Sequence, residues 1–371
     1  MHLKLYAPVL TLAGAMALAF FPSWVAKAGV ETPASEYKVL PPIRHGNLTV
    51  FPVVAAVSHN TQEFLTLDEG LRSGEVLVTE SGSVQPLMRG RVIPVRPDGA
   101  QVNRLVLINN SKRPLILLAG EIVTGGKQDR VIGKDRLIPA ESDPIDLSVF
   151  CVEPGRWTGS ASFGGSGGGI GNGVPAPPAP MAAPAVRGKA MAEKDQGQVW
   201  DEVRKAQAGA ASRLSTSEAV TVEATTSYAR VMENDNVKQK VDSVAAPVER
   251  EYRSLIKQLR DQNAVGVVVA VNGKIIWADM FASTDLLEKY WPKLVRSYAA
   301  EAFVSQAKNH ETDVKTAQAF VETFDGRHET VDSEPGLYRH TEIAGDGFRA
   351  FELTSLLPKT GFDLHVAKMA E

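Results

Sequence analysis

The chain has 371 residues, of which 44% are hydrophobic and 22% are charged, the usual balance of a soluble globular protein with one large domain or two modest ones. A formal net charge of −3 gives no electrostatic reason to bind nucleic acid, so we exclude that class of partner. The single cysteine, Cys151, cannot form an internal disulfide. Its place between Phe150 and Val152 favours a buried small hydrophobic residue over a nucleophile.

Residues 1–28 have the pattern of a secretory signal peptide. Lys4 precedes an uncharged block from Leu5 to Ala26, and Ala26-Lys27-Ala28 places small residues where signal peptidase requires them. We expect cleavage after Ala28 and an exported protein, periplasmic or secreted, with no membrane attachment afterwards. An uncleaved membrane anchor is the alternative, since the block is long enough to span a bilayer. Cleavage would leave 38 basic and 43 acidic residues, a net charge of −5.

Residues 37–157 predict a β-rich lobe. Thr66 opens a short predicted helix with Asp68 and Glu69 in its first turn, where the helix dipole favours acids. The other segments are short, rich in Val, Ile and Leu, and bounded by Gly, Pro, Asn or Ser, which is typical of antiparallel strands. Predicted strands are 47–55, 76–80, 84–88, 91–95, 104–109, 115–119, 130–138 and 145–152.

A low-complexity tract separates this lobe from the rest of the chain. Glycine and serine dominate residues 164–173, and residues 174–186 alternate proline and alanine without an aromatic residue. A segment of this composition cannot bury enough apolar surface to offset the entropy of ordering it. We therefore predict a disordered linker over residues 158–192.

Residues 193–371 predict a second lobe that contains a helix, a hairpin and further helices. Asn272-Gly273 separates two apolar runs, and both residues accept the positive φ of a type I′ turn, which is a strong hairpin signal. Predicted helices are 196–213, 244–261, 284–290, a separate helix from Pro292 to about 306, and 314–324; predicted strands are 336–340, 347–353 and 364–368. The fold class is α+β, with the β-rich lobe packed against this helix–hairpin–helix lobe.

Polar residues concentrate in two stretches of the first lobe, Gly120-Glu-Ile-Val-Thr-Gly-Gly-Lys-Gln-Asp-Arg130 and Cys151-Val-Glu-Pro-Gly-Arg-Trp157. If the strand over 145–152 lies beside the first stretch, these side chains meet at one end of a sheet. The candidate catalytic residues are Glu121 and Glu153, and the candidate ligand-binding residues are Lys127, Gln128, Arg130, Arg156 and Trp157.

These residue types suit a small anionic ligand. Arginine binds anions through two parallel hydrogen bonds, a carboxyl in apolar surroundings has a raised pKa that suits proton transfer, and tryptophan stacks on a sugar or a base. Gln128 would orient the ligand. The alternative is an internal Arg–Glu network that locks two strand ends together, with Trp157 as a packing plug.

Two other kinds of site receive no support from the sequence. Gly120-x4-Gly125-Gly126-Lys127-Gln128 is similar to a P-loop, but the lysine comes one place too late and Gln128 lacks the hydroxyl that binds the metal. The seven histidines are dispersed, so we predict no histidine-based metal site, and no motif for a cofactor is present.

The same motifs resemble the ARPP-1 family, which is named for its association with ADP-ribosylglycohydrolase and rhodanese-phosphatase domains. The resemblance is carried by Leu67-Asp-Glu69, Gly120-Glu121, the two polar stretches, Glu251-Tyr252 and residues 266–281, and so covers most of the chain after the leader. It implies neighbours in ADP-ribose or phosphate chemistry and specifies no mechanism.

Two functional classes follow, and a purely structural protein is a third possibility, which a solvent-free Glu–Arg network around Trp157 would favour. One is an enzyme, hydrolytic because no cofactor motif exists, that acts on a phosphorylated or ribose-containing small molecule, with Glu121 or Glu153 as general acid/base. The other is a non-catalytic envelope module that binds a glycan or a partner protein of unknown identity. Turnover separates the two classes.

Overall fold

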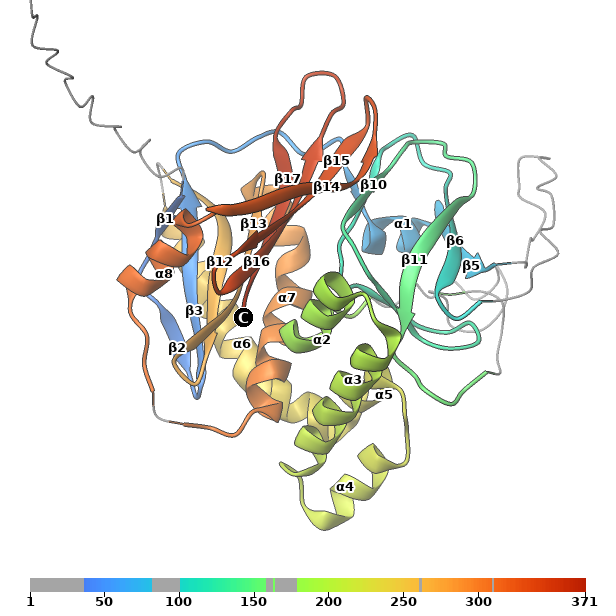
Figure 1. The fold of residues 1–371 in the computed structure, drawn as a ribbon. Helices are drawn as coiled ribbons and strands as arrows, with labels where there is room; N and C mark the ends of the chain where they lie inside the picture. Colours follow the sequence, from blue (N-terminus) through green and yellow to red (C-terminus); the bar gives the residue numbers. More distant parts are fainter. Residues whose placement is uncertain (1–36, 82–100, 158–162, 164–178, 260–261, 309) are drawn as a thin grey trace, which may run out of the picture. The chain divides into compact units, whose positions relative to one another are not determined.

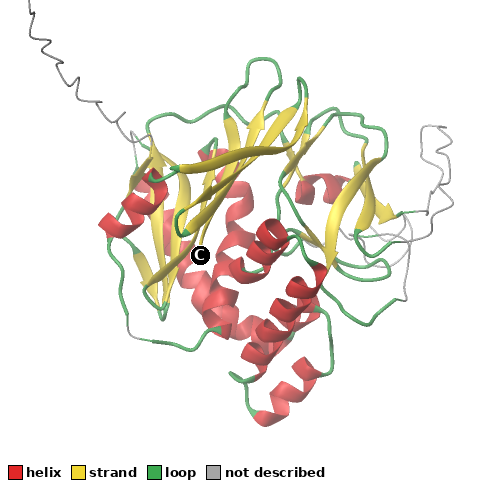
Figure 2. Ribbon diagram, in the orientation of Figure 1, coloured by secondary structure: helices red, strands yellow, loops and turns green. Residues whose placement is uncertain are grey.

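A computed structural model describes residues 37–81, 101–157, 163, 179–259, 262–308 and 310–371, all within one compact unit that runs from Glu36 to Glu371. The predicted signal peptide, the predicted strands over 84–88 and 91–95, and the glycine-rich tract over 164–173 lie outside the described residues. Figures 1 and 2 show helices and strands in similar measure, so the α+β class is correct.

The largest element among the described residues is a nine-stranded sheet. Its strand order is β1-β3-β12-β13-β17-β16-β15-β14, with β2 paired to β3, and every pairing in it is antiparallel. The strands are β1 (Tyr37–Val39), β2 (Ile43–His45), β3 (Leu48–Ala55), β12 (Asn263–Val271), β13 (Lys274–Phe281), β14 (Gly326–Glu334), β15 (Tyr338–Gly345), β16 (Phe348–Ser355) and β17 (Asp363–Ala370).

Helices cover both faces of this sheet. Alternate residues of each strand point to opposite faces, so one strand contributes to two cores. Val267 and Val269 of β12 belong to the core that includes α6 (Asp235–Gln258) and α7 (Thr284–Val304). Val268 and Ala270 of the same strand pack toward α8 (Val314–Glu322) instead. Figure 1 shows α8 and the α6–α7 pair on different sides of β12 and β3. Both faces of β12 are therefore buried, which accounts for its unbroken run of apolar residues.

Two smaller sheets form a β-rich region next to the helices (Figure 1). One has the order β5-β6-β11-β9-β8 and the other β10-β7-β4, in which β4 and β7 are parallel. The strands are β4 (Leu65–Thr66), β5 (Val76–Glu80), β6 (Arg104–Asn109), β7 (Leu115–Leu117), β8 (Ile122–Val123), β9 (Arg130–Ile132), β10 (Arg136–Ile138) and β11 (Ile145–Cys151). Thr66 caps α1 (Leu67–Ser73), as the sequence predicts, and it also forms a capping box with Glu69.

The helical layer between the sheets consists of α2 (Pro184–Gly188), η1 (Lys189–Glu193), α3 (Gln196–Ala211), α4 (Thr216–Glu223) and α5 (Tyr228–Glu233). Their apolar residues join those of α6 and α7 in one core. No helix in the described ranges is both long enough and apolar enough to cross a membrane.

The structure differs from the predicted lobe boundaries at the first strands. Residues 37–55 do not belong to the β-rich region, because β3 pairs along its length with β12, from the second half of the chain. Pro52 lies where β3 changes partner from β2 to β1. Its missing backbone N–H therefore breaks no ladder hydrogen bond on that side of the strand.

The prediction of a disordered linker is wrong for residues 179–192. This segment contains a β-bridge from Met181 to Glu121, followed by α2 and η1, and it is largely buried. Alanine favours helices, and its small side chain lets backbones approach closely, so this run packs although its composition is simple. The predicted break at Pro292 is also wrong, since α7 continues through it. The hairpin turn is correct: Asn272 and Gly273 have φ values of 55° and 73° and connect β12 to β13.

Candidate functional site

A tight turn over residues 125–129 presents the first group of predicted site residues. Gly125 and Gly126 have positive φ values of 107° and 53°, which favour glycine. A Cβ atom on Gly126 would also collide with the ring of Phe163. The turn places Lys127 beside β5, where its backbone N–H donates to Glu80 Oε1 at 2.7 Å.

Glu153 and Arg156 join this turn to the end of β11. Arg156 Nη2 lies 2.5 Å from Glu153 Oε2, and Arg156 Nη1 donates to the carbonyl of Gly126 at 3.1 Å. Glu153 Oε2 also accepts from the backbone N–H of Asp129 at 3.0 Å. The hydrogen bond with Glu153 raises the pKa of Arg156. Glu153, which is almost fully buried, thus holds the arginine and the turn in place.

Gln128 is buried against the same strand end. Its Nε2 donates to the backbone carbonyl of Glu153 at 3.1 Å, while its Oε1 has no hydrogen-bond partner among the described residues. The two polar stretches predicted to meet therefore do meet, through Gln128, Asp129, Glu153 and Arg156.

Two cationic side chains lie beside the ring of Trp157. Lys127 Nζ lies 5.2 Å and Arg130 Cζ 5.8 Å from the ring centroid, within the range of cation–π attraction. The indole is 40% exposed, unusual for so large an apolar side chain. We call Lys127, Arg130, Glu153, Arg156 and Trp157 the Trp157 cluster.

Arg130 is the most unusual member of the Trp157 cluster. It is fully buried, and Nε donates to the carbonyl of Val102 at 2.6 Å. Neither Nη1 nor Nη2 has a hydrogen-bond partner among the described residues. Burial lowers the pKa of Arg130, although nearby acids oppose that shift. A buried guanidinium with two unsatisfied nitrogens is costly, so it suits a ligand with acceptor oxygens.

A hollow of about 370 Å³ opens beside the cluster. We call it the Gly125 hollow, and its wall consists of Thr124, Gly125, Gly126, Asp129, Arg156, Ala229, Arg230 and Glu233. The turn, the end of β11 and helix α5 all contribute to it. Arg156 belongs to both the hollow and the Trp157 cluster and so connects them.

Asp129 is the acidic group of the Gly125 hollow that is best suited to proton transfer. Burial raises the pKa of its carboxyl, an effect offset in part by hydrogen bonds from Ser227 Oγ at 2.6 Å and the N–H of Gly125 at 2.9 Å. Arg156 Nη2 lies 3.7 Å from Asp129 Oδ1. Asp129 is not among the candidate residues predicted from the sequence, although it lies between two of them, Gln128 and Arg130.

Glu121 lies in a different cluster. Its carboxylate accepts from Lys293 Nζ at 2.7 Å and from the N–H of Leu118 at 2.8 Å, and Lys293 also pairs with Asp68 at 2.6 Å. Burial raises the pKa of Glu121, while the charge of Lys293 opposes the rise. Glu121 is fully buried and shares no described partner with Glu153, so the structure does not bring the two predicted catalytic acids together.

A third polar cluster, not expected from the sequence, is sealed in the core. Asp279 binds both guanidinium nitrogens of Arg187, the hydroxyl of Tyr298 and His365 Nε2, while His365 Nδ1 contacts Asp135. All five side chains are fully buried. We call them the Asp279 network. In the described part of the chain, no group of three or more His, Cys, Asp and Glu side chains is placed to hold a metal ion.

The fold and the Trp157 cluster define an α+β protein with a polar hollow, lined by two acids and two arginines, beside an exposed tryptophan. Residues 36–367 match the sequence model of ARPP-1, the ARG and Rhodanese-Phosphatase-superfamily-associated Protein domain, and the chain belongs to this family. No curated protein and no solved structure shows a significant match to the chain.

Proposed function

We propose that this protein is a hydrolase of a phosphorylated or ribose-containing small molecule, with Asp129 as its proton-transfer group. One observation carries the proposal: Asp129 and Arg156 line the same hollow, with 3.7 Å between Oδ1 and Nη2. A guanidinium binds phosphate through charge-assisted hydrogen bonds. A carboxyl with a raised pKa keeps its proton at a higher pH than an exposed aspartate and can donate it to a leaving oxygen.

The Trp157 cluster supplies the remaining binding groups. The exposed indole offers a flat surface for a base or a sugar, and Lys127 and Arg130 add positive charge beside it. The unsatisfied Nη atoms of Arg130 can donate to phosphate or ribose oxygens once a ligand reaches them.

The family description supports the same substrate class. It associates the domain with ARG, the ADP-ribosylglycohydrolases, and with the rhodanese-phosphatase superfamily. ADP-ribose combines two phosphates, two riboses and a base, and so offers a partner to Arg156, Arg130 and Trp157. It is therefore the probe with which we would begin.

The proposal changes the roles of the two predicted acids. Glu153 is a positioning residue, because its carboxylate already binds Arg156 and the backbone of Asp129. Glu121 has no part in the reaction, because it is enclosed with Lys293 in another cluster.

The test is hydrolysis of ADP-ribose by Asp129→Asn, compared with Ser227→Ala. Ser227 Oγ donates to Asp129 Oδ2, so the alanine variant removes that hydrogen bond but keeps the Asp129 carboxyl. We expect the asparagine variant to lose at least 100-fold in turnover, the usual range for a proton-transfer group, and the alanine variant to keep most of it. Equal losses in both variants would assign Asp129 a structural role.

One observation favours the second candidate, a non-catalytic module that binds a glycan or a partner protein. Both oxygens of Asp129 already accept hydrogen bonds, and Arg156 already pairs with Glu153. Such a module would bind its ligand without turnover, and Asp129→Asn would leave that affinity nearly unchanged. Failure of the wild-type protein to hydrolyse ADP-ribose, together with binding of a glycan or a partner protein that Asp129→Asn leaves unchanged, selects this candidate.

We also propose that the mature protein is exported and begins at Gly29. The support is the charged start, the apolar block and the Ala26-Lys27-Ala28 ending of the leader. N-terminal sequencing of the protein from the native host tests it: Gly29 as the first residue agrees with the proposal, and an intact Met1 contradicts it.

A further inference from the structure

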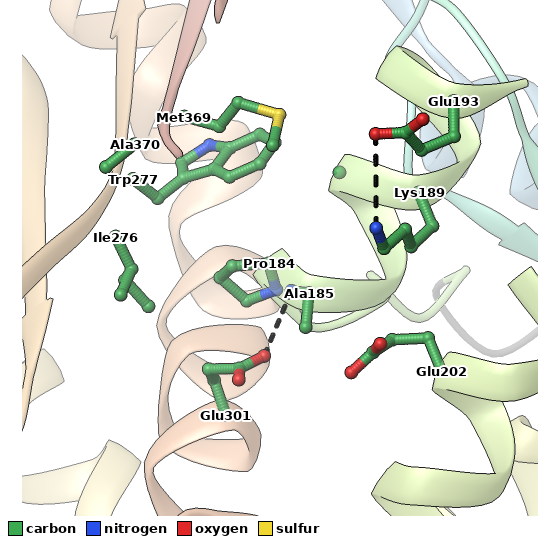
Figure 3. A pocket seen from close by; sticks show the side chains of 11 residues that line it. Pro184, Ala185, Lys189, Glu193, Glu202, Ile276, Trp277, Glu301, Met369 and Ala370 are labelled. Atoms are coloured by element: carbon green, nitrogen blue, oxygen red, sulfur yellow. Dashed lines mark hydrogen bonds and ion pairs between the residues drawn. The ribbon is translucent and has the colours of Figure 1, made fainter. Parts of the chain in front are cut away.

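A second hollow of about 210 Å³ lies where α2, η1, α3 and α7 meet the sheet strands β13 and β17. It shares no wall residue with the Gly125 hollow. Its apolar wall includes Pro184, Ile276, Trp277 and Met369, and its acidic side includes Glu202 and Glu301. Figure 3 shows Glu301 and Glu202 below the indole of Trp277, on opposite sides of the opening.

Glu301 has no cationic partner in the part of the chain that the structure describes. Its Oε2 accepts from the N–H of Ala185 at 3.0 Å, and no Lys, Arg or His side chain in the described ranges forms an ion pair with it. Burial raises the pKa of Glu301, and the nearby charge of Glu202 raises it further. A carboxylate in this position gains from a positive charge placed beside it.

The cations near this hollow are already engaged. Lys189, which is a wall residue of the hollow, lies 3.9 Å from Glu193 and donates to Gln198 Oε1 at 3.4 Å. Lys205 pairs with Glu202 at 3.0 Å, but its side chain is 69% exposed, so solvent screens this pair. Three acids, Glu193, Glu202 and Glu301, therefore face one lysine, Lys189, on the wall of the hollow.

Trp277 is a buried and firmly held part of the apolar wall. Trp277 is 1% exposed, and its ring lies 4.6 Å from the guanidinium carbon of Arg187, which the Asp279 network fixes. The hollow therefore has a fixed apolar wall against which an alkyl chain can pack.

We propose that this hollow binds a small organic cation, a protonated primary amine on a short apolar chain. The ammonium group lies between Glu301 and Glu202, and the chain packs against Trp277, Met369 and Ile276. A cavity of about 150 Å³ holds benzene, so a hollow of 210 Å³ has room for an alkylamine of about five or six heavy atoms. The site is independent of the proposed hydrolase site.

The test is calorimetric titration of the whole protein with n-butylammonium, with n-butanol as the neutral match and butyrate as the anionic one. We expect n-butylammonium to bind and both controls to bind at least tenfold more weakly, since each lacks the charge-assisted hydrogen bond. Equal affinity for the amine and the alcohol would overturn the proposal.

Two variants locate the binding. Glu301→Gln keeps a carbonyl oxygen for the N–H of Ala185, so α2 stays held, and we expect at least tenfold weaker binding of n-butylammonium. The matched control Glu249→Gln changes an acid that pairs with Arg253 on α6, and it should bind like the wild type. Unchanged affinity in Glu301→Gln contradicts the site. Trp157→Ala should also bind the amine normally, so this result does not depend on the hydrolase proposal.

Discussion

Arg187 binds Asp279 with both terminal nitrogens, at 2.9 Å and 3.0 Å, although 92 residues separate them in the chain. Arg187 belongs to α2, in the run of simple composition, and Asp279 belongs to the central hairpin strand β13. Arg187 Nε also donates to the carbonyl of Ala119 at 3.2 Å. One buried side chain thus fastens the helical layer to the large sheet and to the β-rich region.

Replacing Arg187 by methionine should therefore be severe. The change leaves the buried Asp279 carboxylate without its main partner, and breaking a buried pair in this way costs about 3–5 kcal/mol in the free energy of unfolding. Denaturant unfolding measures it. The control Arg204→Met removes an exposed pair with Asp201 and should change stability by less than about 0.5 kcal/mol. Similar small losses in both variants would show that the buried pair does not hold the layers together.

The Asp279 network also predicts how stability depends on pH. Burial disfavours a charged His365, but Asp135 and Asp279 raise its pKa from 6.5 to about 9. A group whose pKa is higher in the folded state adds stability below its unfolded pKa and loses it as pH rises through the folded one. The free energy of unfolding should therefore decrease between pH 6.5 and pH 9, by about 2–3 kcal/mol from this group.

His365→Asn tests this source of the pH dependence. The variant should flatten the decrease between pH 6.5 and pH 9, whereas His328→Asn, a change of an exposed histidine on β14, should keep it. Lys368 works in the opposite direction, because burial lowers its pKa to about 8. If the slope of stability against pH is the same in wild type and His365→Asn, His365 is not charged in the folded protein.

Glu121→Gln separates the buried cluster from the proposed active site. The amide keeps the shape of the side chain but loses the charge that faces Lys293, so we expect a loss of about 1–3 kcal/mol in stability. Turnover per folded molecule should stay the same. Glu153→Gln should instead weaken ligand binding, because it releases Arg156 from its ion pair. Loss of turnover in a fully folded Glu121→Gln protein would restore Glu121 as a catalytic candidate.

Local patterns in the sequence predicted most of the elements. Short apolar runs bounded by turn residues indicated β5, β6 and β11 almost to the residue, and Asn272-Gly273 indicated the β12–β13 hairpin, because these signals depend on neighbours in the chain. The predicted strand over 130–138 is two strands, β9 and β10, because the chain leaves one sheet for another between them.

Long-range contacts explain what the sequence could not indicate. Lys293 binds Glu121 across 172 residues, and no local pattern marks that partner. The pairing of β3 with β12 likewise joins the two halves of the chain, so boundaries drawn from composition separated strands that share a sheet. The sequence predicts the convergence of Glu153 and Arg156 with the 125–129 turn only if the strand over 145–152 lies beside the first polar stretch, and the direct pairing of β9 with β11 meets that condition.

The most direct test of a ligand site at the Trp157 cluster is calorimetric titration of ADP-ribose into wild-type protein and Trp157→Ala. Loss of a stacking surface costs about 1–3 kcal/mol, so we expect affinity for the variant to fall at least fivefold. Leu77→Ala, at a residue with 39% exposure that resembles the 40% of Trp157, should bind like the wild type. Equal affinity of Trp157→Ala and wild type, or no binding of ADP-ribose by either, would contradict the site.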